Sequence, residues 1–303
     1  MRRRDFVRLA SATTAMSSFP VWAREPFGRS GAPRFQLGLA AYSLRKYFAF
    51  SRGKEQKPAS DGKPMDMYRF IDYCVDHAFD TAELTSYFFD PATTDDQFLD
   101  LKHYAFVRGV AVSGTAIGNN FTIGAGPKLE EEVRKAMIWI DRASLLGAPH
   151  VRFFAGTGRQ LQQDPSRMKE ACGAIERCAE YAAKKGVMIG IENHGNLTSD
   201  QMLEIMDRVK SPWVGINLDT GNFLSDDPYR DLERCAPFAV NVQVKVSMKK
   251  PDGEHYPADF KRLADILKRA SYQGYVVLEY EDMDPYGNIP TKLGELKHAL
   301  GVV

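Results

Sequence analysis

Oxygen-bearing side chains stand at the ends of four successive apolar runs in the second half of the sequence. Glu192 ends VMIGIE, Asp219 ends VGINLD, Gln243 lies in VQVKV, and Glu279 follows GYVVL. Runs of this kind are typical of buried parallel strands, whose carboxyl ends lie together at one edge of the sheet. Crowded carboxylates repel each other unless a cation lies between them. The pattern therefore predicts a metal ion bound by these four residues.

The ligand types indicate which ion to expect. Three carboxylates and one amide form a hard set of oxygen ligands, which suits Mn²⁺ or Mg²⁺. We expect one divalent ion, Mn²⁺ first, with Mg²⁺ or Co²⁺ as alternatives. The ligand oxygens should then converge on one point at about 2.0–2.6 Å. A single carboxylate at a strand end is more often a helix cap or an ion-pair partner, so the prediction rests on all four together.

Further polar and aromatic residues near the same strand ends are predicted to bind substrate. His194 and Lys245 each follow a predicted ligand by two positions, and side chains two apart leave a strand on the same side. His194 either binds a sugar hydroxyl, or supports a neighbouring ligand residue or caps a helix. Lys245 either stabilises an oxyanion or neutralises Glu281. The predicted substrate-binding residues are His194, Lys245, Arg152, Glu83 and Tyr42. For Arg152 and Glu83 the alternative is a structural ion pair, and for Tyr42 a place in the core.

The elements that position these residues follow from an alternation of short apolar runs with amphipathic stretches. The predicted strands are 35–42, 81–85, 110–114, 150–154, 187–192, 214–219, 239–246 and 274–280. The predicted helices are 66–78, 95–108, 129–146, 165–185, 199–209, 228–235, 259–270 and 291–300. Eight strand–helix units predict a single-domain α/β fold, a (β/α)₈ TIM barrel over residues 35–303. An open doubly wound sheet is the alternative, but no G-x-G-x-x-G follows the first strand.

The strand-end motifs resemble those of a known family. IENH, GINLDTGN, VQVKV and VLEYE occur in the order found in the xylose-isomerase-like TIM-barrel family of sugar isomerases and epimerases. ELTSYFF and GTAIGNN are similar to a branch described as sugar phosphate isomerases and epimerases. The resemblance implies one metal ion held by Glu, Asp, His and Glu, here Glu192, Asp219, Gln243 and Glu279. Gln243 stands where many members have His, which should weaken any preference for Zn²⁺ or Co²⁺.

The same resemblance implies a reaction. A metal ion that binds a carbonyl oxygen and a neighbouring hydroxyl makes the proton on the carbon next to the carbonyl acidic. Glu192 and Glu279 are then the catalytic residues on opposite faces of the substrate. Returning the proton to the other face is epimerisation, and moving it to the neighbouring carbon is isomerisation. A 3-keto-glycoside lyase using the same site and a non-catalytic sugar-binding barrel remain alternatives. KKPDGEHYP offers no phosphate cradle, which favours a non-phosphorylated or 3-keto sugar or glycoside.

The first 34 residues form a separate part of the sequence. RRRDFVRLA resembles a twin-arginine export signal, and VWA, ending at Ala23, is a fitting cleavage site. We therefore expect a signal peptide over 1–23, a linker over 24–34, and a periplasmic or extracellular enzyme. A disordered basic tail is the alternative.

Charge and composition limit the classes of molecule that this protein can be expected to bind. The formal net charge of +1 gives no general attraction for nucleic acid. A DNA-repair enzyme of the endonuclease IV type is disfavoured because the six histidines lie mostly outside the strand-end motifs. No apolar run approaches about 20 residues, so we expect no stable membrane association after signal removal. The expected partner is a small-molecule carbohydrate, and homo-oligomerisation stays open. The four cysteines contain no C-x-x-C pair, which favours free buried thiols and leaves one disulfide open.

Overall fold

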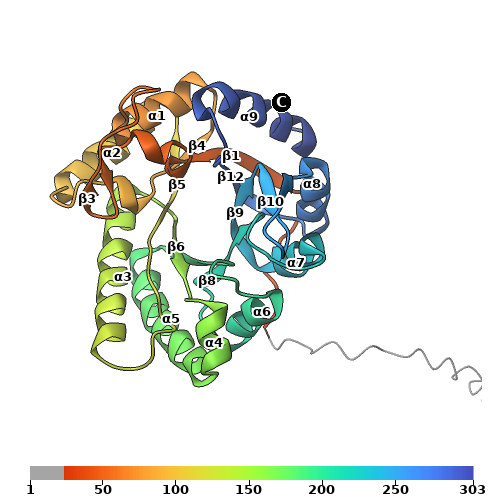
Figure 1. Cartoon of the computed structure of the whole chain (residues 1–303). Coiled ribbons are helices and arrows are strands. Elements are labelled where there is room, and N and C mark those ends of the chain that lie inside the picture. Colours follow the sequence, from red (N-terminus) through yellow and green to blue (C-terminus); the bar gives the residue numbers. More distant parts are fainter. Residues whose placement is uncertain (1–23, 303) are drawn as a thin grey trace, which may run out of the picture.

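The computed structural model describes residues 24–302, and its centre is a closed barrel of eight parallel strands (Figure 1). Around the barrel the strands follow the order β1-β12-β9-β8-β7-β6-β5-β4. Their bounds are β1 Arg34–Ala40, β4 Thr81–Glu83, β5 Ala111–Ala116, β6 His150–Phe154, β7 Met188–Glu192, β8 Val214–Asp219, β9 Ala239–Lys245 and β12 Gln273–Glu279. The predicted (β/α)₈ barrel is thereby confirmed.

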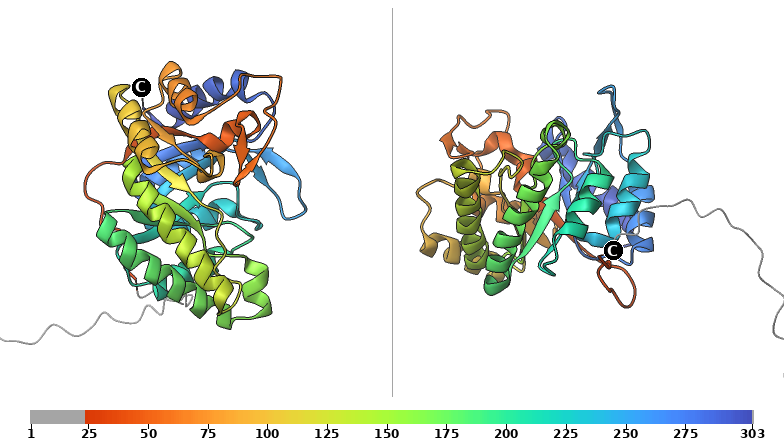
Figure 2. Two further views of the ribbon diagram at one scale, coloured as in Figure 1. Left: turned by 90° about the vertical axis from the view of Figure 1, so that its left-hand side faces the viewer. Right: turned by 90° about the horizontal axis from the view of Figure 1, so that it is seen from below.

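Helices between the strands cover the outside of the barrel (Figure 2). Their bounds are α1 Met67–Asp76, α2 Asp95–Val107, α3 Pro127–Leu146, α4 Gly158–Gln163, α5 Ser166–Lys185, α6 Ser199–Arg208, α7 Pro228–Cys235, α8 Phe260–Arg269 and α9 Pro285–Leu300. Local sequence sets several of the starts. Thr94 and Gln97 form a capping box at α2, and Thr198 and Gln201 form another at α6. Of the nine, only the short α4 has no counterpart among the predicted helices.

Strand register brings the predicted site residues to one rim. Glu192 pairs with Asn217 between β7 and β8, Asp219 pairs with Gln243 between β8 and β9, and Glu279 pairs with Lys245 between β12 and β9. All six residues of β8 are buried, as expected for a strand covered on both faces. Four neighbouring strands thus end at the same level, at the carboxyl-terminal mouth of the barrel.

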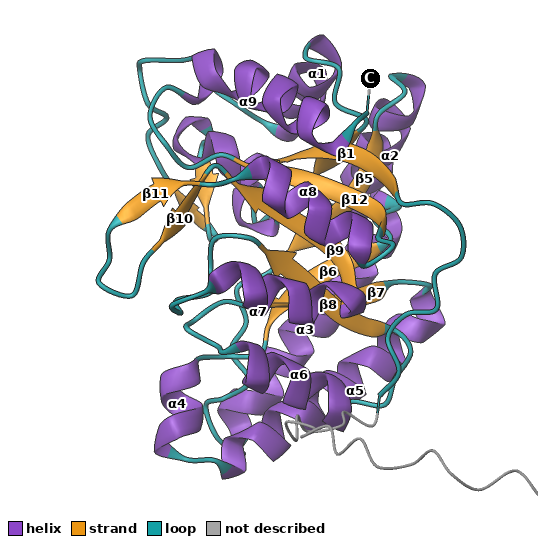
Figure 3. Cartoon of the chain, turned by 90° about the vertical axis from the view of Figure 1, so that its right-hand side faces the viewer, coloured by secondary structure: helices purple, strands orange, loops and turns teal. Residues whose placement is uncertain are grey.

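Two small hairpins extend from the barrel. β2 Phe50–Ser51 and β3 Lys54–Glu55 form one, and β10 Ser247–Lys249 and β11 His255–Pro257 form the other, which projects clearly in Figure 3. The first hairpin lies in the polar, glycine-containing stretch of residues 47–63. The first strand ends at Ala40 rather than at Tyr42, because Ala41–Tyr47 forms a 3-10 helix. Tyr42 therefore approaches the mouth from this helix.

Residues 24–34, predicted to be a linker, pack against the barrel. Arg24 donates hydrogen bonds to the carbonyls of Val209 at 3.2 Å and Val214 at 2.6 Å, and the amide of Phe27 donates to the carbonyl of Pro237 at 3.3 Å. Val214 begins β8, so this segment lies at the end of the barrel opposite the mouth. The predicted signal peptide, residues 1–23, lies outside the described residues.

Two further expectations concern membranes and cysteines. Within residues 24–302, no helix combines the length and the apolar character needed to cross a membrane. All four cysteines are buried and free, as favoured from the sequence.

Candidate functional site

A cavity of about 140 Å³ opens at the carboxyl ends of the strands. We call it the mouth cavity. Its lining residues are Tyr42, Arg52, Tyr87, Arg152, Phe154, Glu192, His194, Asn222, Lys245, Glu279 and Glu281. Both predicted catalytic residues therefore face one space, together with four of the five predicted substrate-binding residues.

The first feature of this cavity is a buried ion pair between neighbouring strands. Arg152 Nε lies 2.9 Å from Glu192 Oε2, and both side chains are less than a tenth exposed. Asn222 donates a hydrogen bond of 2.9 Å to the other carboxylate oxygen of Glu192. Burial alone would lower the pKa of Arg152, but Tyr87 and Glu192 raise it above its ordinary value. Arg152 is therefore a permanent cation beside Glu192.

The second feature is a lysine surrounded by carboxylates. Lys245 Nζ lies 2.5 Å from Glu279 Oε1, 3.1 Å from Glu281 Oε2 and 3.5 Å from Asp219 Oδ2. Burial alone would lower the pKa of Lys245, but Asp219, Glu279 and Glu281 raise it well above its ordinary value. The ammonium is therefore charged at neutral pH. It occupies the position between the carboxylates of β8 and β12.

A third group of polar residues lies buried in the barrel and does not line the mouth cavity. Gln243 Nε2 donates to both carboxyl oxygens of Glu83, at 3.3 and 3.2 Å. The amide oxygen of Gln243 accepts a hydrogen bond of 2.6 Å from Asn217. Burial, together with the charge of Glu279, raises the pKa of Glu83 to about 8. Glu83 is thus mainly protonated at pH 7 and does not line the mouth cavity, so its role in substrate binding remains a prediction from the sequence.

The predicted metal ligands reach one rim, but they do not converge on one point. Glu192 pairs with Arg152, Asp219 and Glu279 pair with Lys245, and Gln243 turns its oxygen to Asn217. Within the described part of the chain, no group of three or more His, Cys, Asp or Glu side chains is arranged to hold a metal ion. An ammonium and a divalent ion repel each other when both lie beside the same carboxylates. In this arrangement the residues do not fit a divalent ion, and the Mn²⁺ site remains a prediction from the sequence alone.

Some lining residues were not singled out as substrate-binding from the sequence. The ring of Phe154 lies 4.1 Å from the Arg152 guanidinium and stacks on His194 with centroids 4.1 Å apart. Phe154 follows Arg152 by two positions in β6, so strand alternation could have indicated it. Arg52 lies in the turn of the β2–β3 hairpin with a φ of 52°, and no periodicity predicts where such a turn points. His194 does not cap α6, since Thr198 does.

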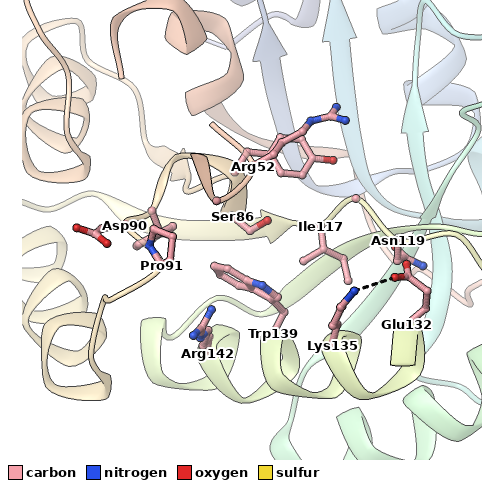
Figure 4. Close-up of a pocket in the computed structure, with 14 residues that line it drawn as sticks. Arg52, Ser86, Asp90, Pro91, Ile117, Asn119, Glu132, Lys135, Trp139 and Arg142 are labelled. Atoms are coloured by element: carbon pink, nitrogen blue, oxygen red, sulfur yellow. Dashed lines mark hydrogen bonds and ion pairs between the residues drawn. The ribbon is translucent and has the colours of Figure 1, made fainter. Parts of the chain in front are cut away.

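A second, larger cavity of about 400 Å³ lies beside the mouth cavity, between the segments that follow β4 and β5 and helix α3 (Figure 4). We call it the lateral cavity. Its lining residues are Arg52, Gly53, Ser86, Tyr87, Phe89, Asp90, Pro91, Ile117, Gly118, Asn119, Glu132, Lys135, Trp139 and Arg142. Arg52 and Tyr87 line both cavities, so the two spaces adjoin.

Comparison with known proteins supports the architecture. A family model described as xylose isomerase-like TIM barrel matches residues 71–300. A search of curated proteins finds no match.

Similar solved structures share the fold at low sequence identity. D-psicose 3-epimerase with D-tagatose from Clostridium cellulolyticum H10 is 14% identical with a TM-score of 0.68, covering 88% of this chain and 99% of its own. The apo 3-keto-D-glucoside 4-epimerase YcjR from E. coli is 15% identical with a TM-score of 0.62, covering 88% and 100%. The IOLI protein with a bound zinc atom is 14% identical with a TM-score of 0.67, covering 88% and 98%.

Proposed function

The chain belongs to the xylose isomerase-like TIM-barrel family, and from this we propose that it is a sugar isomerase or epimerase that moves a proton on the carbon next to a carbonyl group. One observation supports this more than any other. Two carboxylate–cation pairs, Glu192 with Arg152 and Glu279 with Lys245, face the same cavity. A carboxylate can accept the proton while a neighbouring cation stabilises the negative charge that develops on oxygen.

The proposed step uses the residues of this chain alone. Glu279 removes the proton, the C–H electron pair becomes the new C=C bond, and the carbonyl π electrons move to oxygen. Lys245 and Arg152 then stabilise the enediolate by charge and hydrogen bonds. In epimerisation Glu192 enters the step protonated, donates its proton to the opposite face and is left as the carboxylate beside Arg152, while Glu279 keeps the proton it removed until that proton exchanges with solvent. Return of the proton held by Glu279 to the neighbouring carbon gives aldose–ketose isomerisation instead.

The divalent ion predicted from the sequence has no step in this proposal. When bound, such an ion would act as a Lewis acid on the carbonyl oxygen. Here the Lys245 ammonium lies among the carboxylates that would have to hold it. We therefore assign the electrophilic role to Lys245 and Arg152.

The proposed substrate is a non-phosphorylated or 3-keto sugar or glycoside. Two structural neighbours are described as epimerases of D-psicose and of a 3-keto-D-glucoside. We further propose that the twin-arginine-type segment directs export, so that the enzyme meets this substrate in the periplasm or outside the cell.

Solvent deuterium exchange tests the proposed reaction. The protein is incubated in D₂O with ketohexoses and with 3-keto-glucosides, and the products are followed by proton NMR. We expect one deuterium on the carbon next to the carbonyl, accompanied by the epimer or isomer. Exchange accompanied by release of the aglycone would instead favour the lyase. If no sugar of either kind exchanges, the proposed reaction is wrong, and the alternative of a non-catalytic sugar-binding barrel is favoured.

A further inference from the structure

The lateral cavity combines aromatic and cationic side chains on one face of α3. Lys135, Trp139 and Arg142 are spaced four and three positions apart, which places them on the same side of the helix. Figure 4 shows all three side chains directed from the helix into the cavity, with Ser86 and Arg52 across from them. Trp139 packs against Phe89 with ring centroids 5.8 Å apart, and the Arg142 guanidinium lies 4.8 Å from the Trp139 ring.

Three cationic side chains and two acidic ones line this cavity, which leaves an excess of one positive charge: Arg52, Lys135 and Arg142 against Asp90 and Glu132. Glu132 is already engaged by Lys135 at 3.4 Å and by the amide of Asn120 at 3.0 Å. Arg52 and Arg142 contact aromatic rings, and among residues 24–302 neither guanidinium has a carboxylate within ion-pair distance. Two guanidinium groups beside aromatic surface suit a planar group that bears negative charge.

The lateral cavity also adjoins the mouth cavity. The Arg52 guanidinium lies 4.6 Å from the Tyr87 ring, and the Tyr87 hydroxyl lies 3.5 Å from Arg152 Nη1. Arg152 in turn pairs with Glu192 in the mouth cavity. A ligand passing Tyr87 can therefore have one part beside the proposed catalytic carboxylates and another beside Trp139. The lateral cavity, at about 400 Å³, lies within the range of about 300–1,000 Å³ found for ligand pockets, whereas the mouth cavity is smaller.

We propose that the lateral cavity binds the second group of a two-part substrate, an aromatic aglycone bearing an acidic group, while the sugar ring lies in the mouth cavity. This inference rests on the proposed function and names its substrate class, a 3-keto aryl glycoside with a carboxylate or similar anion on the aglycone. Trp139 and Tyr87 provide the aromatic surface, and Arg52 and Arg142 bind the anion.

Calorimetric titration with unoxidised glucosides tests this without turnover. The ligands are methyl, phenyl and 4-carboxyphenyl β-D-glucoside and glucose 6-phosphate. We expect phenyl glucoside to bind more tightly than methyl glucoside. The carboxyphenyl compound should bind about tenfold more tightly than phenyl glucoside, because its carboxylate gains one charge-assisted hydrogen bond. Arg142→Met should abolish the carboxylate advantage. Arg134→Met is the matched control, because Arg134 lies on the same helix, pairs with Glu131 at 2.7 Å and does not line the cavity.

Each other outcome overturns the inference. Equal affinity for the three glucosides would mean that the lateral cavity contributes nothing, although deuterium exchange could still support the proposed reaction. Tightest binding of glucose 6-phosphate would assign the cations to a phosphoryl group. Equal losses in Arg142→Met and Arg134→Met would show a general charge effect rather than a site. Absence of binding by every glucoside would also refute it, and exchange in D₂O would then decide separately on the proposed function.

Discussion

Replacing Lys245 with methionine tests whether an ammonium takes the position of a metal ion. Methionine keeps most of the length of the side chain and removes the charge. Lys245 contacts the buried carboxylates of Asp219 and Glu279, and the more exposed Glu281, which is 38% exposed and better screened by solvent. Removing one partner of a buried ion pair typically costs about 3–5 kcal/mol. We expect a loss of unfolding free energy of that order at pH 7.

The same substitution should create a metal site. Without the ammonium, the oxygens of Asp219, Glu279 and Glu281 face a position that no cation fills, and such oxygens suit Mn²⁺ or Mg²⁺. An ion present at 100 times its dissociation constant stabilises the folded state by about 2.7 kcal/mol. Added Mn²⁺ should therefore restore more than half of the lost stability in Lys245→Met, and should leave the wild type unchanged.

Thermal unfolding followed by circular dichroism measures both effects. Each protein is heated with EDTA and with MnCl₂ at matched ionic strength. We expect the melting temperature of Lys245→Met to fall by about 5–10 °C in EDTA and to recover partly with Mn²⁺. Lys292→Met is the control, because Lys292 pairs with Glu295 on the surface of α9 at 2.7 Å and such pairs contribute about 0–1 kcal/mol. If EDTA lowered the melting temperature and the exchange activity of the wild type, and Mn²⁺ restored both, our assignment of Lys245 would be wrong.

Three further predictions concern catalysis, pH and export. Glu279→Gln should slow deuterium exchange by about 10²–10⁴-fold, the usual contribution of a general base, whereas Glu281→Gln should cost much less; equal mild effects would make Glu279 structural. Burial lowers the pKa of His150 from 6.5 to about 4, so the unfolded chain takes up its proton first as pH falls. The unfolding free energy of the wild type, measured by urea titration, should then decline between about pH 6.5 and 4. His150→Gln should reduce this decline by about 3 kcal/mol, and an unchanged decline would contradict the lowered pKa of His150. Replacing Arg3 and Arg4 with lysine should leave a tagged protein in the cytoplasm, and undiminished export would favour the alternative of a basic tail.

The barrel and its rim could be predicted because burial is visible in a sequence. HVRFF and VGINLD are short stretches in which apolar residues predominate, and the structure has strands at the same bounds, His150–Phe154 and Val214–Asp219. The first strand was extended too far because the apolar run continues through Ala41 and Tyr42, where the chain already turns into a 3-10 helix. Periodicity indicates which residues are apolar and which side they face, but a short helix that continues the same run leaves no break in it.

The pairing of charges at the rim could not be predicted in the same way. Lys245 meets Glu279 because β9 and β12 are adjacent in that register, which depends on how the barrel closes. The sequence spacing of Lys245 and Gln243 shows only that both face inward. Likewise, the amide oxygen of Gln243 cannot point both to Asn217 and to a metal ion. Its hydrogen-bond partner depends on the neighbouring strand β8, which carries Asn217. Side-chain partners across strands are therefore set by tertiary structure.

The charge needed at this rim can be supplied in two ways. Carboxylates from β7, β8 and β12 require positive charge between them, and one divalent ion would provide two charges at a single point. Arg152 and Lys245 provide the same total charge at two points, each beside one proposed catalytic carboxylate. Cations attached to the chain cannot be removed by a chelator, and they bind an oxygen through directional hydrogen bonds rather than by coordination. We therefore propose that an inward-facing Arg in β6 and an inward-facing Lys in β9 carry this charge, at a rim where Gln243 stands in place of the His that the family resemblance implies for many members.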